Sequence, residues 1–275
     1  ATGNGGGIYA NAALTATGAQ FVSNLAGYGG GGAYGNGQTQ IFGGVFRQNS
    51  APGYGGGGLN AGNAVSISGT QFLTNSGYYG GAIYAGGAVW MTGGLLAGNS
   101  AVGSGGGADL EGGGAITGTR IQDNRCGGCG PYGGGGVWSV GDLRVTAARF
   151  AGNSTGSVGG GLAFGTGATA GSLIVVNTLF AANVAPAGAA IAVGGAASAW
   201  IVHTTIASPT LASGSAIDVA SSTANISNTI VASHALGING SASTVAENYN
   251  LFFGNTTNTA GAITGGMGSG GGDPR

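Results

Sequence analysis

The acidic residues are the first candidates for chemistry, because enzymes that cleave polysaccharides use paired carboxylates or carboxylates that hold calcium. The chain contains seven of them: Asp109, Glu111, Asp123, Asp142, Asp218, Glu247 and Asp273. Only Asp109 and Glu111 have the spacing that puts two side chains on one face of a strand. Because the others are scattered, we predict no catalytic residues and no enzymatic activity. A polysaccharide lyase or glycoside hydrolase is the alternative.

The two cysteines and two histidines are the candidates for redox or metal chemistry. Cys126 and Cys129 are separated by two glycines. A redox motif of this spacing normally begins a helix, and a zinc site would need two further ligands. We therefore predict a local disulfide, which implies an oxidising, extracellular location. His203 and His234 lack partners at metal-ligand spacing and are predicted to be structural, so neither metal nor cofactor is expected.

Charge is scarce along the chain, which has six arginines, no lysine, seven acidic residues and a net charge of −1 over 275 residues. Without a basic stripe the chain cannot neutralise phosphates, so nucleic acid is not an expected partner. No run of 18 apolar residues is uninterrupted, so insertion into a membrane is not expected. The low charge provides little repulsion between copies, which favours self-association.

A repeated unit must position these residues. Each repeat begins with a glycine triplet, or a variant of it that ends in alanine, and a short apolar strand, and most repeats contain a later phenylalanine or aliphatic residue with asparagine three places on. The last residue of the triplet stands at positions 7, 32, 58, 82, 107, 136, 161, 190 and 216. A period of about 25 residues is typical of a solenoid.

Three short strands are predicted in each repeat, from in–out alternation after the triplet, before the phenylalanine and around it. Phe21, Phe46 and Phe72 are predicted to point inward, and glycines such as Gly18 and Gly43 to bend the chain. The predicted fold is an all-β parallel β-helix of nine to ten coils over residues 1–260. A Gly-rich tail is predicted over residues 261–275.

The asparagine that follows each phenylalanine is predicted to form a buried ladder of hydrogen bonds between coils, and to tolerate a left-handed corner. Its members are Asn24, Asn49, Asn75, Asn99, Asn124, Asn153 and Asn183. An isolated strand does not need asparagine at this position, whereas stacked coils allow identical amides to bond to one another.

Two columns of side chains are predicted to face outward. Arg120 and Arg149 are expected to lie in adjacent coils, either as two solvated arginines or as an anion site. The middle residues of the first strands form the candidate binding column: Tyr9, Tyr34, Asn60, Tyr84, Asp109 and Trp138. Nearby corner tyrosines repeat the pattern, namely Tyr28, Tyr54, Tyr78 and Tyr132. These rings suit a glycan or a protein contact, although tyrosine also simply favours strands.

The motifs Gly80–Tyr84 (Gly-Gly-Ala-Ile-Tyr) and Phe72–Asn75 (Phe-x-x-Asn) resemble the repeats of chlamydial polymorphic outer-membrane proteins. They are also similar to right-handed parallel β-helix surface proteins of the pectate-lyase-like superfamily. The resemblance implies an extracellular structural or adhesive protein at the cell surface. Its expected partners are copies of itself, joined end to end into a fibre or through the tail, other surface proteins, or a glycan.

Overall fold

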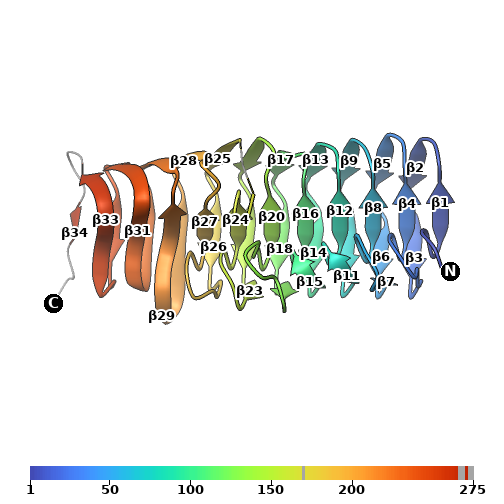
Figure 1. Ribbon diagram of the computed structural model, residues 1–275, viewed down its shortest axis with the longest axis horizontal. Coiled ribbons are helices and arrows are strands. Elements are labelled where there is room, and N and C mark those ends of the chain that lie inside the picture. Colours follow the sequence, from blue (N-terminus) through green and yellow to red (C-terminus); the bar gives the residue numbers. More distant parts are fainter. Residues whose placement is uncertain (169–170, 266–269, 272–275) are drawn as a thin grey trace.

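The structure is a computed structural model that describes residues 1–168, 171–265 and 270–271. Among these residues the regular secondary structure consists of β-strands alone, and the chain winds into about ten stacked coils. The strands β1 (Ile8–Ala10) and β33 (Thr257–Gly265) lie at opposite ends of the stack (Figure 1). Strands pair in parallel with their equivalents in the next coil. The predicted fold class, an all-β parallel solenoid, is confirmed. The described residues contain no helix that could span a lipid bilayer.

The first strand of each coil follows the glycine triplet, and these strands form one face of the rod. They are β1 (Ile8–Ala10), β4 (Ala33–Gly35), β8 (Leu59–Ala61), β12 (Ile83–Ala85), β16 (Ala108–Leu110), β20 (Val137–Ser139), β24 (Leu162–Phe164) and β27 (Ile191–Val193). Tyr84 lies opposite Asp109, and Asp109 lies opposite Trp138. The predicted column of equivalent residues is therefore in register.

The second strands form the next face. They are β2 (Leu14–Thr17), β5 (Thr39–Phe42), β9 (Val65–Ser68), β13 (Val89–Thr92), β17 (Gly114–Thr117), β21 (Leu143–Thr146), β25 (Ser172–Val176), β28 (Ser198–Val202) and β30 (Thr223–Ser227). A left-handed residue follows each of them, as in Gly18 and Gly43 with φ of 60° and 62°. These glycines make the predicted bend, because a left-handed corner is strained for most other residues.

The third strands form the last main face. They are β3 (Gln20–Val22), β6 (Val45–Arg47), β10 (Gln71–Leu73), β14 (Leu95–Ala97), β18 (Arg120–Gln122), β22 (Arg149–Ala151), β26 (Leu179–Ala181), β32 (Leu251–Phe253) and β34 (Gly270–Gly271). Arg120 and Arg149 lie opposite each other in β18 and β22, and both are exposed.

Five coils contain a fourth strand that the sequence did not predict. These strands are β7 (Ser50–Ala51), β11 (Ser76–Tyr79), β15 (Ser100–Ser104), β19 (Arg125–Cys126) and β23 (Ser154–Thr155), and they form a separate parallel sheet. Each follows the ladder asparagine directly. The chain there runs extended toward the next glycine triplet, so equivalent segments of successive coils can pair.

The coils at the C-terminal end contain long strands that continue through the corners: β29 (Thr205–Ala220), β31 (Ile230–Asn248) and β33 (Thr257–Gly265). Strand β33 crosses the predicted boundary at residue 260 and pairs with β31. Of the predicted tail 261–275, residues 266–269 and 272–275 lie outside the described residues.

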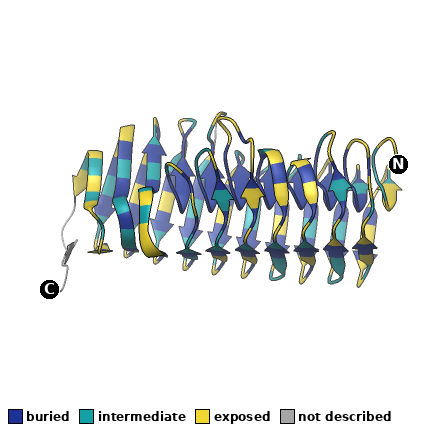
Figure 2. Ribbon diagram, turned by 90° about the horizontal axis from the view of Figure 1, so that it is seen from below, coloured by how far each residue is buried: buried dark blue, intermediate teal, exposed yellow. Residues whose placement is uncertain are grey.

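The core is a continuous column inside the coils, where buried and exposed residues alternate along the strands (Figure 2). Phe21, Phe46 and Phe72 point inward, as predicted, and the last two are fully buried. Their rings stack, with centroids 4.5 Å apart between Phe21 and Phe46 and 4.7 Å apart between Phe46 and Phe72. Repetition of one side chain at one position therefore produces repeated packing along the rod axis.

The asparagine column forms a ladder in which successive amides bond. The Asn49 Nδ2 atom donates to Asn75 Oδ1 at 2.9 Å, and the Asn49 backbone N–H donates to the same oxygen at 3.0 Å. Asn49 Nδ2 also donates to the carbonyl oxygen of Phe21 at 2.9 Å. The same pattern joins each pair from Asn24 to Asn183. Interior amides thus use both donors and both acceptor positions.

The expected left-handed backbone at the ladder asparagines is wrong. The positive φ belongs to the preceding residue, such as Gln48 at 56°, Thr74 at 52° and Asp123 at 55°. The asparagine side chains are instead turned into the coil, where they bond to the neighbouring amides. Asn24 is half-buried, and the other six are buried.

Candidate functional site

The predicted binding column is largely covered. Tyr9 is 55% exposed and Tyr34 is half-buried, but Asn60, Tyr84, Asp109 and Trp138 are all buried. The prediction of an exposed column is therefore wrong for these four residues. Their side chains do point away from the core, but the segments between the third strand and the next glycine triplet fold over them. The covering residues include Tyr54, Tyr79 and Tyr132, which lie beside the column in one pocket.

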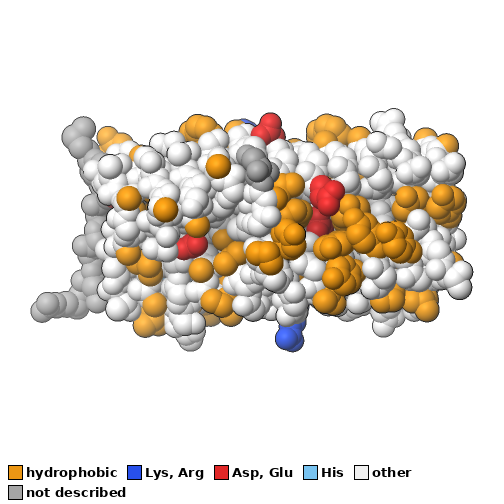
Figure 3. Space-filling model, in the orientation of Figure 1, with side chains coloured by type: hydrophobic (Ala, Val, Ile, Leu, Met, Phe, Trp, Pro, Cys, Tyr) orange, Lys and Arg blue, Asp and Glu red, His pale blue; other side chains and the backbone are white. Residues whose placement is uncertain are grey.

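This cover leaves a pocket of about 200 Å³ near the middle of the rod. We call it the aromatic–acidic pocket. Its lining residues are Tyr54, Tyr79, Ser104, Asp109, Glu111, Tyr132 and Trp138. Figure 3 shows acidic side chains surrounded by hydrophobic ones on this face, over β12, β16 and β20. Strand β16 supplies Asp109, β20 supplies Trp138, and the fourth strands β11 and β15 supply Tyr79 and Ser104.

Asp109 is the most unusual residue of the pocket, since its side chain is only 1% exposed. The Ser104 hydroxyl donates a hydrogen bond to its Oδ2 atom. Its Oδ1 atom is buried and has no hydrogen-bond partner among the described residues. A buried polar atom without a partner costs about 1–3 kcal/mol, so such an atom is uncommon unless a ligand or another group satisfies it.

The protonation of Asp109 follows from this environment. Burial raises the pKa of Asp109 to about 7, and the nearby charge of Glu111 acts in the same direction. The hydrogen bond from Ser104 opposes this increase because it favours the carboxylate. Glu111 is exposed at the rim of the pocket. Near neutral pH Asp109 is therefore close to the midpoint of its titration.

The aromatic rings form two edge-to-face groups around the carboxylates. Tyr54 contacts Tyr79 with ring centroids 5.1 Å apart at 80°, and it contacts Tyr84 at 5.5 Å and 65°. Tyr132 contacts Trp138 at 5.5 Å and 84°. The Trp138 indole donates to the carbonyl oxygen of Thr166 at 3.2 Å, which fixes the plane of its ring. Burial raises the pKa values of Tyr79 and Tyr84, so both stay neutral phenols.

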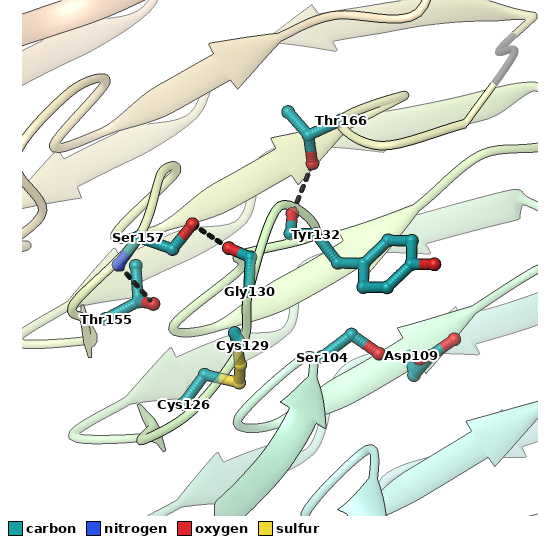
Figure 4. The surroundings of a disulfide bond; sticks show 9 residues. All are labelled: Ser104, Asp109, Cys126, Cys129, Gly130, Tyr132, Thr155, Ser157 and Thr166. Carbon is teal, nitrogen blue, oxygen red and sulfur yellow. Dashed lines mark hydrogen bonds between the residues drawn. A yellow bond between two sulfur atoms is a disulfide. The ribbon is translucent and has the colours of Figure 1, made fainter.

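Tyr132 is held over the pocket by the enlarged loop that contains Cys126 and Cys129. These cysteines form a close pair, with Cα atoms 5.7 Å apart. The backbone N–H of Tyr132 donates to the Cys129 carbonyl at 3.0 Å. The Thr166 hydroxyl, from the next coil, donates to the Tyr132 carbonyl (Figure 4). The loop is therefore fastened both within itself and to the neighbouring coil.

The other candidate residues do not gather into a site of this kind. His203 is exposed in a left-handed corner with φ of 51°. His234 is buried, its Nδ1 lies 2.8 Å from the Ala232 carbonyl oxygen, and burial lowers its pKa. Among the described residues no group of three His, Cys, Asp or Glu side chains could hold a metal. Asp218 lies four coils from Asp109 along the same column.

Two residues of the pocket were not recognised in the sequence. Tyr79 lines the pocket, whereas its neighbour Tyr78, which the repeat of corner tyrosines favoured, is exposed. Ser104 was not singled out because a lone serine in a Gly-rich segment gives no signal. Both residues belong to the unpredicted fourth strands.

No protein-family profile, curated protein or solved structure matches this chain. The role of the aromatic–acidic pocket must therefore be argued from its own chemistry.

Proposed function

We propose that this protein is a structural and adhesive β-solenoid that works outside the cell. In this proposal the stack of coils is the rigid support, and the aromatic–acidic pocket on its flank is the contact site. The observation that carries the proposal is the buried Asp109 Oδ1 atom, a carboxyl oxygen that has no partner among the described residues. The other two buried side-chain atoms without a partner there are hydroxyl oxygens, those of Thr146 and Ser243. A ligand would supply the missing hydrogen bond.

The extracellular location rests on the cysteine pair. We infer that Cys126 and Cys129 form a disulfide, because their separation of 5.7 Å between Cα atoms suits one. Disulfides of this kind persist in oxidising environments. The likeness of the Gly-Gly-Ala-Ile-Tyr and Phe-x-x-Asn repeats to bacterial surface β-helix proteins points in the same direction.

Adhesion can be tested with beads that carry the chain and an array of purified extracellular-matrix proteins, mucins and glycans. The pocket variant is Tyr132→Ala, which removes a partly exposed ring of the loop. The control is Trp90→Ala, which removes an exposed ring on the second-strand face. We expect wild-type beads to bind at least one member, Tyr132→Ala to weaken that binding, and Trp90→Ala to keep it. No binding, or equal loss in both variants, would contradict the proposal.

An enzyme of the same fold is the second candidate function, because Asp109 and Glu111 place two carboxylates in one pocket. Two carboxylates in different environments can act as general acid and base on a glycosidic bond. However, Asp109 is 1% exposed, so a polysaccharide would reach it only after the tyrosines move. Release of reducing ends or unsaturated uronides, lost in Asp109→Asn, would establish this alternative.

Assembly into a fibre is a further part of the proposal. Each coil pairs with the next through backbone hydrogen bonds, and an end coil presents the same groups to any added strand. A second copy, stacked end to end or added through the tail segment, is one source of such a strand. The low net charge supports close approach of copies.

A further inference from the structure

We propose that the aromatic–acidic pocket binds the guanidinium group of an arginine side chain that a partner protein presents. This inference rests on the proposed adhesive function and specifies the chemistry of its contact. It is carried by the unpartnered Oδ1 atom of Asp109, a residue that lines the pocket together with four aromatic rings and a second acidic residue, Glu111.

The charge of the pocket favours a cation. Asp109 and Glu111 are its two ionisable carboxyl groups, and its lining contains no arginine or histidine. A cation that enters between tyrosine and tryptophan rings is also attracted by their faces. Two carboxylates and four rings in one small pocket therefore select for positive charge with an extended, weakly hydrated surface.

Among organic cations the guanidinium group fits best. The Asp109 Oδ1 atom needs an N–H donor, which a quaternary ammonium group cannot supply. Because Asp109 is only 1% exposed, a donor reaches this atom only after the covering tyrosines move, as is also true for a polysaccharide. A guanidinium group has five N–H donors in a plane, and it can bond to carboxylates while its face lies on an aromatic ring. A lysine ammonium is a compact, strongly hydrated charge that stacks less well.

The size of the pocket indicates the end of a side chain rather than a whole ligand. Its volume is about 200 Å³. Pockets for drug-sized molecules are usually about 300–1,000 Å³. A planar head group on a narrow stem matches this smaller space, since the remainder of the partner can stay outside the rim at Glu111.

Binding of a cation should depend on pH through Asp109. The titratable groups that face Asp109 or line the same pocket are Glu111 and the phenols of Tyr54, Tyr79, Tyr84 and Tyr132. Because a cation binds the carboxylate form, affinity should rise as pH rises through the pKa of Asp109, about 7. If only the ionised form binds, affinity is about tenfold lower at pH 6 than at pH 8.

Titration calorimetry with N-acetyl-arginine amide and N-acetyl-citrulline amide tests the inference, because citrulline has nearly the same shape without the charge. We expect the arginine probe to bind at pH 8 at least tenfold more tightly than the citrulline probe. Asp109→Asn should weaken binding and abolish its pH dependence, and Glu111→Gln should weaken it less. Asp142→Asn, which changes an exposed acid elsewhere, should match the wild type. Equal binding of both probes would overturn the inference.

The outcomes separate this inference from the proposed function. If the citrulline probe or a neutral glycan binds in a Tyr132-dependent way and arginine does not, the inference fails and the pocket is still a contact site. If no probe binds and Tyr132→Ala leaves adhesion unchanged, both fail. Sedimentation velocity with and without the arginine probe identifies the source of the guanidinium. Self-association that the probe reverses points to exposed arginines of a second copy, such as Arg120 or Arg149. A monomer that binds the probe points to another protein.

Discussion

Asn75 donates two hydrogen bonds to a single oxygen atom of Asn99, one from its backbone N–H at 2.8 Å and one from its Nδ2 at 3.0 Å. The pair lies in the interior of the rod, where water cannot replace either bond. Asn75 is in turn the acceptor for the same two donors of Asn49. One side chain therefore links three successive coils.

Replacement of Asn75 by alanine should lower the free energy of unfolding by about 1–3 kcal/mol, because two buried donors of Asn49 lose their acceptor. Urea unfolding measures this change. The matched control is Asn24→Ala, since Asn24 is half-buried and begins the ladder, so no preceding asparagine of the ladder donates to it. The control should be affected less. Equal midpoints for the wild type and Asn75→Ala would contradict a stabilising role of the ladder.

Asp109 should make stability fall as pH rises. The pKa of Asp109 is about 7 in the folded chain, and the ordinary value of 3.8 applies to the unfolded chain, so the folded state binds the proton more tightly. The contribution to stability is therefore fully present below about pH 4, is lost between pH 4 and 7, and stays lost above pH 7. At 1.36 kcal/mol per pKa unit the loss is at most about 4 kcal/mol.

Asp109→Asn removes this dependence, so the difference in unfolding free energy between variant and wild type should shift in favour of the variant between pH 4.5 and pH 8. Chemical unfolding at several pH values measures it. Asp142→Asn serves as the control, because Asp142 is exposed. A difference that stays constant with pH would show that Asp109 is not buried as described.

The close pair of Cys126 and Cys129 should be inert to alkylation until a reductant is added. Intact-mass measurement after treatment with iodoacetamide would then show no adduct without reductant and two adducts with it. Cys126→Ser should loosen the loop that holds Tyr132 and make the segment after Cys129 more sensitive to proteases than in the wild type. Two adducts without reductant would mean that the cysteines are free thiols.

The chain should associate with itself at micromolar concentration, because an open coil end can pair with an added strand and little charge opposes the contact. Light scattering over several days measures this. If the contact is end to end, the scattering mass should grow continuously, since a head-to-tail contact that does not close gives an open chain of copies. A stable monomer after long incubation would rule out assembly by this route.

The sequence was sufficient to predict the parts of this structure that repeat. Each coil places a residue directly above its equivalent, so a column of Phe21, Phe46 and Phe72 in the sequence becomes a stack of rings in space. The glycine that follows the second strand is equally readable, because few other residues adopt φ near +60° without strain. The period of the sequence therefore predicts both the core residues and the residues at the corners of the coils.

The pocket was predicted less well, because it depends on what differs between coils. Whether Asp109 is exposed is decided by segments that precede and follow its own strand, and these differ in length and in the placing of their tyrosines. The side chain of Tyr79 covers the column, whereas that of Tyr78, one residue earlier, is exposed. In an extended segment, neighbouring side chains point to opposite faces, so a shift of one residue turns a side chain from one face to the other. No periodic feature of the sequence indicates which of the two tyrosines faces the column.

The ladder of asparagine amides also gives the rod a direction. From Asn24 to Asn183 every bond between two side-chain amides runs from the nitrogen of one amide to the oxygen of the amide that follows it along the chain. The two ends of the ladder are therefore chemically different: Asn24 donates to the next amide, and Asn183 accepts from the preceding one. An added coil could continue the ladder only at the N-terminal end, by donating to Asn24, because the coils after Asn183 separate the other end of the ladder from the end of the described stack.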